Sequence, residues 1–277
     1  MEKRMPPITV GVQLFGFAKL LKKDPEKTLR QIRQIGYEAI EPVISLPDVE
    51  QLWNYAPWTL QTLKQDFALA KELGFQVPSA HINTGLFGKT PHKIIEGIRQ
   101  IHQETGIGVF VFSGMFSTPA GAKRWGPLLG AVAAGVQALG CRVLYHNHDC
   151  EFSSPSGKRV LDIFLEHAGQ LVGLQLDIGW AGIGWEELAA VAHYKDRIVE
   201  IHCKDFVSGA RGRSLMTMPT HFFTAIGDGC IRTRQALSMI PELTQFNGVI
   251  IIDQDHSANG ILADAQKGLQ NVKEMIL

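Results

Sequence analysis

Short apolar runs of strand length alternate with amphipathic stretches of helix length along the chain, and this alternation limits the possible folds more than any other feature. Glycine often marks the exit from a helix-like stretch just before the next strand, as at Gly36, Gly74 and Gly140. We predict eight strands, at residues 8–15, 37–43, 76–82, 108–113, 142–147, 172–177, 198–203 and 248–253.

Amphipathic helices are expected between these strands. In residues 24–35, Asp24 has the character of an N-cap, Pro25 takes the first helical position, and Leu29 and Ile32 fall on one apolar stripe. The other expected helices cover residues 59–73, 93–103, 121–139, 160–168, 185–192, 231–240 and 263–276.

Eight strands, each followed by a helix, are the arithmetic of a closed (β/α)8 barrel, so we predict an α/β chain with one TIM-barrel domain over residues 1–277. An open doubly wound sheet uses the same alternation, but its ligand site normally needs a G-x-G-x-x-G turn, which is missing here. The longest expected irregular segment, 206–228, follows the seventh strand, where a long loop is usually functional. Its Arg211 and Arg213 are candidates to hold a phosphate or to be solvated.

Residues that can bind a divalent metal ion stand at the C-terminal ends of four expected strands. His146, Asp177, His202 and Asp253 each close an apolar run. One such residue is more often a structural group than a ligand, but these ends meet at one mouth of a barrel, where enzymes of this fold carry their chemistry. Several buried imidazoles and carboxylates at one place need a cation or a hydrogen-bond network, and this donor set suits Mn, Zn, Co or Mg.

The alternation of side chains within each strand supports this convergence. Successive residues of a strand point to opposite faces, and in a barrel one face lies under the helices while the other lines the axis. The polar parity contains Gln175 and Asp177 in the sixth strand, and Glu200, His202 and Lys204 in and after the seventh. We therefore expect the polar set to point inward and to end at the mouth.

Composition narrows the function classes. Lys and Arg together number 27, as do Asp and Glu, so the chain lacks the positive charge of an electrostatic nucleic-acid binder. No apolar stretch approaches the length that spans a bilayer, and the first residues lack the apolar core of a signal peptide, so we expect no membrane contact and a cytoplasmic location. The four scattered cysteines are expected to be reduced. A small, uncharged or weakly charged substrate is expected, and a homo-oligomer stays open.

The strings His-Asn-His-Asp-Cys-Glu-Phe at 146–152 and His-Cys-Lys-Asp at 202–205 are fairly specific in combination. With the segments at 11–15, 35–41, 176–180, 227–229 and 252–255, they make the chain resemble the xylose isomerase-like superfamily of TIM barrels, in particular the sugar phosphate isomerase/epimerase group, over nearly its full length. The resemblance implies a divalent ion held by Glu, Asp, His and Glu at the ends of strands five to eight. Asp177 and His202 match this pattern, whereas His146 and Asp253 replace the two glutamates.

The resemblance also implies proton abstraction beside a sugar carbonyl, with a stabilised enediolate. We assign His146, Asp177, His202 and Asp253 as ligands of the metal ion. Glu151 and His148 are acid/base candidates, Lys204 is expected to polarise or anchor an oxygen, and His81, Glu41 and Trp180 are candidate substrate contacts.

Because the two glutamates are altered, simple two-carboxylate epimerisation is in doubt. A dehydratase or lyase acting on an inosose or 3-keto-sugar stands close behind an isomerase/epimerase. A metal-dependent phosphodiesterase and a non-catalytic sugar-binding barrel are less favoured. In every case the expected ligand is a small sugar or polyol.

Overall fold

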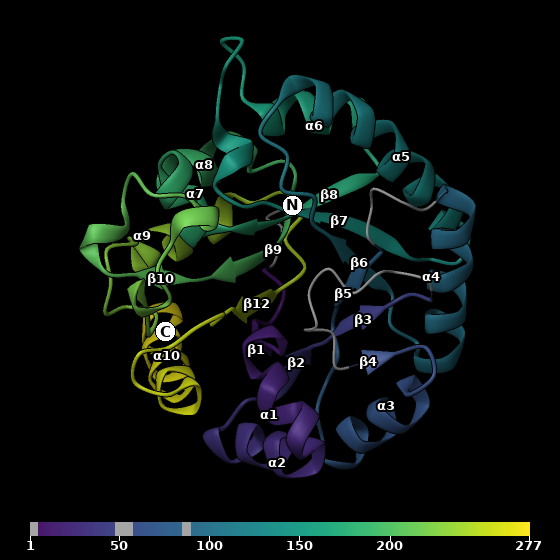
Figure 1. The fold of residues 1–277 in the computed structure, drawn as a ribbon, viewed down its shortest axis with the longest axis vertical. Coiled ribbons are helices and arrows are strands. Elements are labelled where there is room, and N and C mark those ends of the chain that lie inside the picture. Colours follow the sequence, from purple (N-terminus) through teal and green to yellow (C-terminus); the bar gives the residue numbers. More distant parts are fainter. Residues whose placement is uncertain (1–4, 48–57, 85–89) are drawn as a thin grey trace.

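The computed structural model describes residues 5–47, 58–84 and 90–277. Parallel strands curl around a common axis, and helices form an outer ring around them (Figure 1). The order of the sheet is β2-β1-β12-β9-β8-β7-β6-β5-β3-β4. This is the predicted α/β TIM-barrel architecture.

The strand that closes the barrel is divided at Pro42. Its first half, β2 (Ala39–Glu41), pairs with β1 (Thr9–Gln13), and its second half, β3 (Val43–Ser45), pairs with β5 (Ala80–Asn83). Thus β2, at one end of the sheet order, and β3, next to the other end, are consecutive in the chain. A hydrogen bond from His81 N to Pro42 O (2.9 Å) joins them at the break, because proline offers an acceptor but no donor.

The predicted strands all exist, with differences at their ends. The sixth and seventh, β8 (Val172–Asp177) and β9 (Ile198–Cys203), agree with prediction residue for residue. The third begins four residues later than predicted, since the chain at Gln76 makes only an isolated bridge to Ala39 and Pro78 follows. The other predicted strands are β6 (Val109–Phe112), β7 (Arg142–His146) and β12 (Val249–Ile252). The short strand β4 (Trp58–Thr59) was not predicted, and Thr59 was expected to begin a helix.

Helices cover the outside of the barrel. The first expected one, α2 (Pro25–Ile35), begins where Asp24 Oδ1 accepts a hydrogen bond from Lys27 N (2.9 Å), and Gly36 ends it with a φ of 108°. The structure adds two short helices that we did not predict, α1 (Ala18–Lys23) and α7 (Ile178–Gly184). The others are α3 (Leu63–Glu72), α4 (Pro91–Thr105), α5 (Pro119–Gln137), α6 (Val160–Ala168), α8 (Glu187–Tyr194), α9 (Thr233–Ser238) and α10 (Ile261–Ile276).

Residues 206–228, expected to be irregular, are locally ordered. The short strands β10 (Asp205–Phe206) and β11 (Phe223–Thr224) pair antiparallel, and three 3-10 turns lie between them. The Asp205 carboxylate organises the end of the segment, because it accepts hydrogen bonds from the backbone N–H groups of Gly227, Gly229 and Ile231. The segment thus forms a fixed cover after the seventh strand.

The axis of the barrel is polar, and the layer between strands and helices is apolar. Glu41, Ser79, Gln175, Glu200 and His202 are all buried and hydrogen-bonded to one another along the axis. The prediction that Gln175 in the sixth strand and Glu200 and His202 in the seventh point toward the barrel axis is therefore confirmed. A polar interior of this kind is stable only when its groups find partners, and that requirement positions the site described next.

In the described part of the chain, no helix has both the length and the apolarity that crossing a membrane would require. All four cysteines are unpaired.

Candidate metal centre

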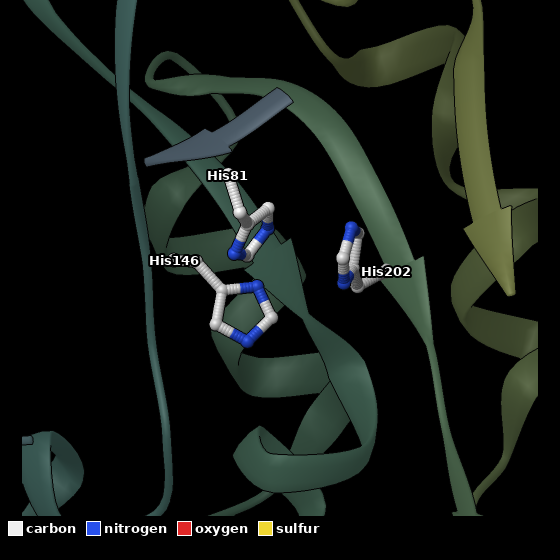
Figure 2. Close-up of side chains that lie close together, drawn as sticks. All are labelled: His81, His146 and His202. Atoms are coloured by element: carbon white, nitrogen blue, oxygen red, sulfur yellow. The ribbon is translucent and has the colours of Figure 1, made fainter. Parts of the chain in front are cut away.

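The four side chains predicted as metal ligands lie together at the C-terminal mouth of the barrel. His146, Asp177, His202 and Asp253 are buried, and one nitrogen or oxygen atom from each lies within 4.8 Å of those of the others. His81 forms a second such group with His146 and His202. Figure 2 shows these three imidazoles, which come from different strands and turn toward one another. The strand ends bring together residues that are far apart in sequence.

His202 is held by a carboxylate on each side of its ring. Its Nε2 lies 2.8 Å from Glu41 Oε2, and its Nδ1 lies 3.3 Å from Asp253 Oδ2. Burial lowers the pKa of His202, but Glu41 and Asp253 outweigh burial and raise it to about 10. The Glu41 contact fixes the ring and leaves Nδ1 facing Asp253, which is the arrangement of a metal-binding histidine supported by a carboxylate.

His146 is oriented by Gln175, a residue that our sequence-based site did not include. Gln175 Nε2 donates to Glu41 Oε1 (2.7 Å) and Glu200 Oε2 (2.9 Å), so its Oε1 must be the acceptor. That oxygen lies 3.1 Å from His146 Nδ1 and 2.8 Å from His81 Nε2. His146 therefore donates through Nδ1, and its Nε2, 3.8 Å from Asp177 Oδ2, keeps a free lone pair. Burial, followed by the neighbouring His202, holds the pKa of His146 well below its usual range, so the ring is neutral.

Two carboxylate oxygens at this mouth lack a hydrogen-bond partner among the described residues. Asp177 Oδ1 accepts from Trp180 N (2.8 Å), but Asp177 Oδ2 and Asp253 Oδ1 are buried and unpartnered. A buried polar atom without a hydrogen bond lowers the free energy of unfolding by roughly 1–3 kcal/mol, and the cost is larger when the group is charged. A divalent cation would satisfy both oxygens, and two imidazoles with two carboxylates are a donor set that Zn, Mn and Co accept. The residues present therefore fit a metal ion.

Lys204 brings a positive charge to this cluster. Its Nζ lies 2.5 Å from Asp255 Oδ2, 2.9 Å from Asp253 Oδ2 and 3.7 Å from Asp177 Oδ2. Burial lowers the pKa of Lys204, but the three carboxylates outweigh burial and raise it, so the ammonium is permanently charged. His202, whose pKa is raised, faces Asp253 as a second positive group. Burial, followed by the neighbouring Asp253, raises the pKa of Asp177 to about 6 and that of Asp255 to about 7. A divalent cation at this place would favour the ionised form of both carboxylates.

His148 stands beside the cluster and is partly exposed. Its ring centroid lies 5.2 Å from that of His146, and its Nδ1 has no hydrogen-bond partner in the described chain. Burial and the Lys204 ammonium lower the pKa of His148 to about 3. A neutral imidazole with a free nitrogen at the mouth can exchange a proton with a bound molecule.

The structure places Glu151 away from the cluster. Its Oε1 accepts from Tyr145 OH (2.6 Å), and its Oε2 accepts from His148 N (3.0 Å) and from Cys150 Sγ (3.2 Å). Tyr145 belongs to the opposite strand parity from His146 and packs under helix α6, so Glu151 stands in the apolar layer outside the strands. The hypothesis that Glu151 supplies a missing carboxylate to the site is therefore corrected: its carboxylate is already committed to the local turn.

Glu41 and Trp180, two of the three expected substrate contacts, are buried and contact other residues of the protein. Glu41 is fully buried and accepts from Gln13, Ser79 and Gln175 in addition to His202. Trp180 is likewise fully buried and packs against Phe206 and Phe223, with ring centroids 4.8 Å and 6.1 Å away. Of the three expected contacts, only His81 is partly exposed, with 15% of its side chain accessible.

Arg211 and Arg213, which were candidates to hold a phosphate or to be solvated, both bind groups of the protein. Arg211 donates to Gly182 O (2.8 Å) and Cys230 O (2.8 Å) and pairs with the buried Glu187. Arg213 donates to Gly209 O and lies over the Phe222 ring. Both arginines hold the 206–228 segment together.

No protein-family model and no curated protein matches this sequence. Solved structures match it along nearly its whole length. A sugar phosphate isomerase/epimerase from Parabacteroides distasonis superposes with a TM-score of 0.75 at 16% identity, over 99% of this chain and 98% of that one. The IolI protein with a bound zinc atom gives 0.68 at 13% identity, over 97% and 98% of the two chains.

A D-tagatose 3-epimerase-like protein gives a TM-score of 0.68 at 16% identity, over 97% of each chain. The chain thus has the fold of the xylose isomerase-like TIM barrels, which confirms the resemblance seen in the sequence at the level of the fold.

Proposed function

We propose that this protein is a metal-dependent sugar isomerase that moves a proton between carbons beside a carbonyl. The observation that carries the proposal is the mouth cluster, in which two buried carboxylate oxygens have no hydrogen-bond partner among the described residues and lie beside two oriented imidazoles. His146, Asp177, His202 and Asp253 would hold the ion, which is Mn, Zn, Co or Mg. The names of structural neighbours, which include a sugar phosphate isomerase/epimerase and a zinc-bound IolI protein, support a sugar substrate and a metal.

The bound ion would act as a Lewis acid for the negative charge that develops on neighbouring sugar oxygens. The protein's own groups then divide the remaining work. The Lys204 ammonium is fixed by Asp255 and can hold a substrate oxygen, because it stays charged. His148, neutral and partly exposed, can take the proton from one carbon and return it to the next. His81 donates through Nε2 to Gln175 Oε1, so its Nδ1 would accept a hydrogen bond from a sugar hydroxyl at the rim.

The arrangement favours isomerisation over epimerisation. Inversion at one carbon needs proton donors on both faces of the sugar, and here His146 and Asp253 stand where the resemblance implies glutamates. Glu151 is engaged by Tyr145, so His148 is the acid/base group on one side. A single base that shuttles one proton suits transfer between neighbouring carbons on the same face.

A lyase acting on an inosose or 3-keto-sugar is the second candidate. Elimination also needs one base, and it needs a cation near the leaving oxygen. Lys204 lies at the cluster, 2.9 Å from Asp253 Oδ2, and the His148 ring lies beside His146 at the same mouth. The same residues therefore support loss of a β-hydroxyl.

The test is incubation of Mn-supplied protein in deuterated water with a panel of unphosphorylated keto-sugars and inososes. Deuterium uptake without loss of water supports the isomerase, and loss of a hydroxyl supports the lyase. His148→Gln should remove label uptake while retaining the metal. Asp162→Asn, on helix α6 away from the mouth, is the matched control and should change neither. Metal-loaded protein that is inert toward the whole panel would contradict the proposal.

A further inference from the structure

A cavity of about 300 Å³ lies next to the candidate metal centre, at the same mouth of the barrel. Its wall is formed by the chain after β1, with Phe15, Ala18 and Leu20, and by the chain after β12, with Ile261 at the start of α10. Most of this wall is apolar. The two loops fit closely, because a side chain at Gly16 would collide with the backbone carbonyl of Gln254.

The cavity adjoins the candidate site at Asp255. This carboxylate lines the cavity and also accepts a hydrogen bond from Lys204 Nζ (2.5 Å), which in turn lies 2.9 Å from Asp253. A molecule held by Lys204 and the metal ligands therefore has the cavity beside it. The volume is at the lower end of the range for ligand sites, roughly 300–1,000 Å³, so it suits one part of a substrate.

The charges around the cavity disfavour an anionic group. Asp255 stands in its wall, and Asp264 occupies the first turn of α10, where Ser257 Oγ donates to it (2.5 Å) and its carboxylate uses the positive end of the helix. Lys19 lines the rim but is exposed, and an exposed ammonium in water binds an anion weakly. Arg211 and Arg213 hold backbone carbonyls elsewhere.

We propose that the substrate is an unphosphorylated sugar carrying an uncharged, largely apolar substituent about one ring in size, and that this substituent occupies the cavity between Phe15 and Ile261. The inference rests on the proposed sugar chemistry for the reacting end of the molecule. The inference adds that the protein binds the substituent of the sugar through apolar contacts.

The test compares the binding of defined probes to the Mn-supplied protein by isothermal titration calorimetry. Phenyl β-D-glucopyranoside should bind at least about tenfold more tightly than methyl β-D-glucopyranoside, since the ring buries apolar surface. Glucose 6-phosphate should bind no more tightly than glucose. Ile261→Trp should fill the cavity and remove the preference for the phenyl glucoside. Leu262→Trp, the next residue of the same helix and outside the cavity wall, should retain that preference.

Equal affinities for the two glucosides, no binding of either, or tighter binding of glucose 6-phosphate would each overturn the inference. So would loss of the preference in both tryptophan variants, provided that their thermal unfolding shows both to be folded. The deuterium assay on unsubstituted sugars decides the isomerase proposal separately, so failure of one proposal is distinguishable from failure of the other.

Discussion

Two layers of buried carboxylates lie on the axis of this barrel, and they differ in how well their oxygens are satisfied. In the deep layer, Glu41 and Glu200 accept hydrogen bonds on both oxygens, for example from Ser79, Gln175 and Asn247. In the mouth layer, Asp177 and Asp253 each keep one buried oxygen without a hydrogen-bond partner in the described chain. The contrast separates a scaffold, which is complete by itself, from a site that needs another component.

The histidines link the two layers. His202 contacts Glu41 below and Asp253 above, and Gln175 fixes His146 and His81 from below. The deep layer therefore orients both imidazoles, so that His202 Nδ1 faces Asp253 and His146 Nε2 faces Asp177. A satisfied second layer of this kind makes a metal-binding layer rigid before the ion arrives.

The largest expected effect is on the deep layer. Glu41→Ala removes the carboxylate that accepts hydrogen bonds from Gln13, Ser79, Gln175 and His202. It also leaves the buried positive charge of His202 without this counter-charge. We expect a loss of about 3–5 kcal/mol in the free energy of unfolding, measured by urea denaturation. Glu72→Ala, at an exposed carboxylate, should cost less than about 0.5 kcal/mol. Similar costs for the two variants would mean that the hydrogen bonds of Glu41 do not hold the deep layer together.

The next effect is the response of the mouth layer to metal. Mn or Zn at about 100 times the dissociation constant should raise the free energy of unfolding by about 2.7 kcal/mol, and a chelator should reverse the gain. Asp177→Asn and Asp253→Asn should each lose most of this gain, as measured by thermal unfolding with and without the ion. Asp162→Asn should retain all of it. Metal-dependent stabilisation that survives in both mouth variants would contradict the ligand assignment.

A smaller effect of opposite sign is expected in metal-free protein. Asp177→Asn keeps the acceptor for Trp180 N and removes a buried charge that has an unpartnered oxygen, so it should raise the free energy of unfolding by about 1 kcal/mol. Glu200→Gln replaces one hydrogen-bonded oxygen by an NH₂ group that faces the amide donor of Gln175 or Asn247. Burial and Glu41 raise the pKa of Glu200 and so disfavour its charge, but we expect the lost acceptor to outweigh removal of that charge and to lower stability by about 1–3 kcal/mol. Chelator-treated variants compared by urea denaturation would show whether the signs differ. Loss of stability in both variants would mean that the charge of Asp177 does not destabilise the metal-free protein.

The sequence predicts the strands and the four mouth residues because both depend on local patterns. An apolar run of period two that ends in His or Asp gives the strand, its inward face and its end, which is how Asp177 and His202 were located. Gln175 was missed, although its parity with Asp177 was visible, because a polar residue inside a strand is as often a structural group as a functional one.

Glu151 was misplaced for a different reason. A residue after a strand has no fixed parity, so the path of the turn at Cys150–Phe152 decided which way its carboxylate points. Trp180 was ambiguous in the same way, since burial under Phe206 and Phe223 depends on a segment that we expected to be irregular. Long-range packing of loops is not contained in the local pattern of either residue.

The smallest expected effect concerns Glu151, the carboxylate in the turn just outside both layers. Glu151→Gln still accepts from Tyr145 OH through its amide oxygen but loses an acceptor for His148 N or Cys150 Sγ, so stability should fall by about 1 kcal/mol. Metal retention and deuterium uptake should stay within about twofold of the wild type, because the carboxylate is not at the mouth. The measurements are metal content after gel filtration and the label assay. A loss of uptake of about a hundredfold, the usual minimum contribution of a general acid/base, would return Glu151 to the catalytic group.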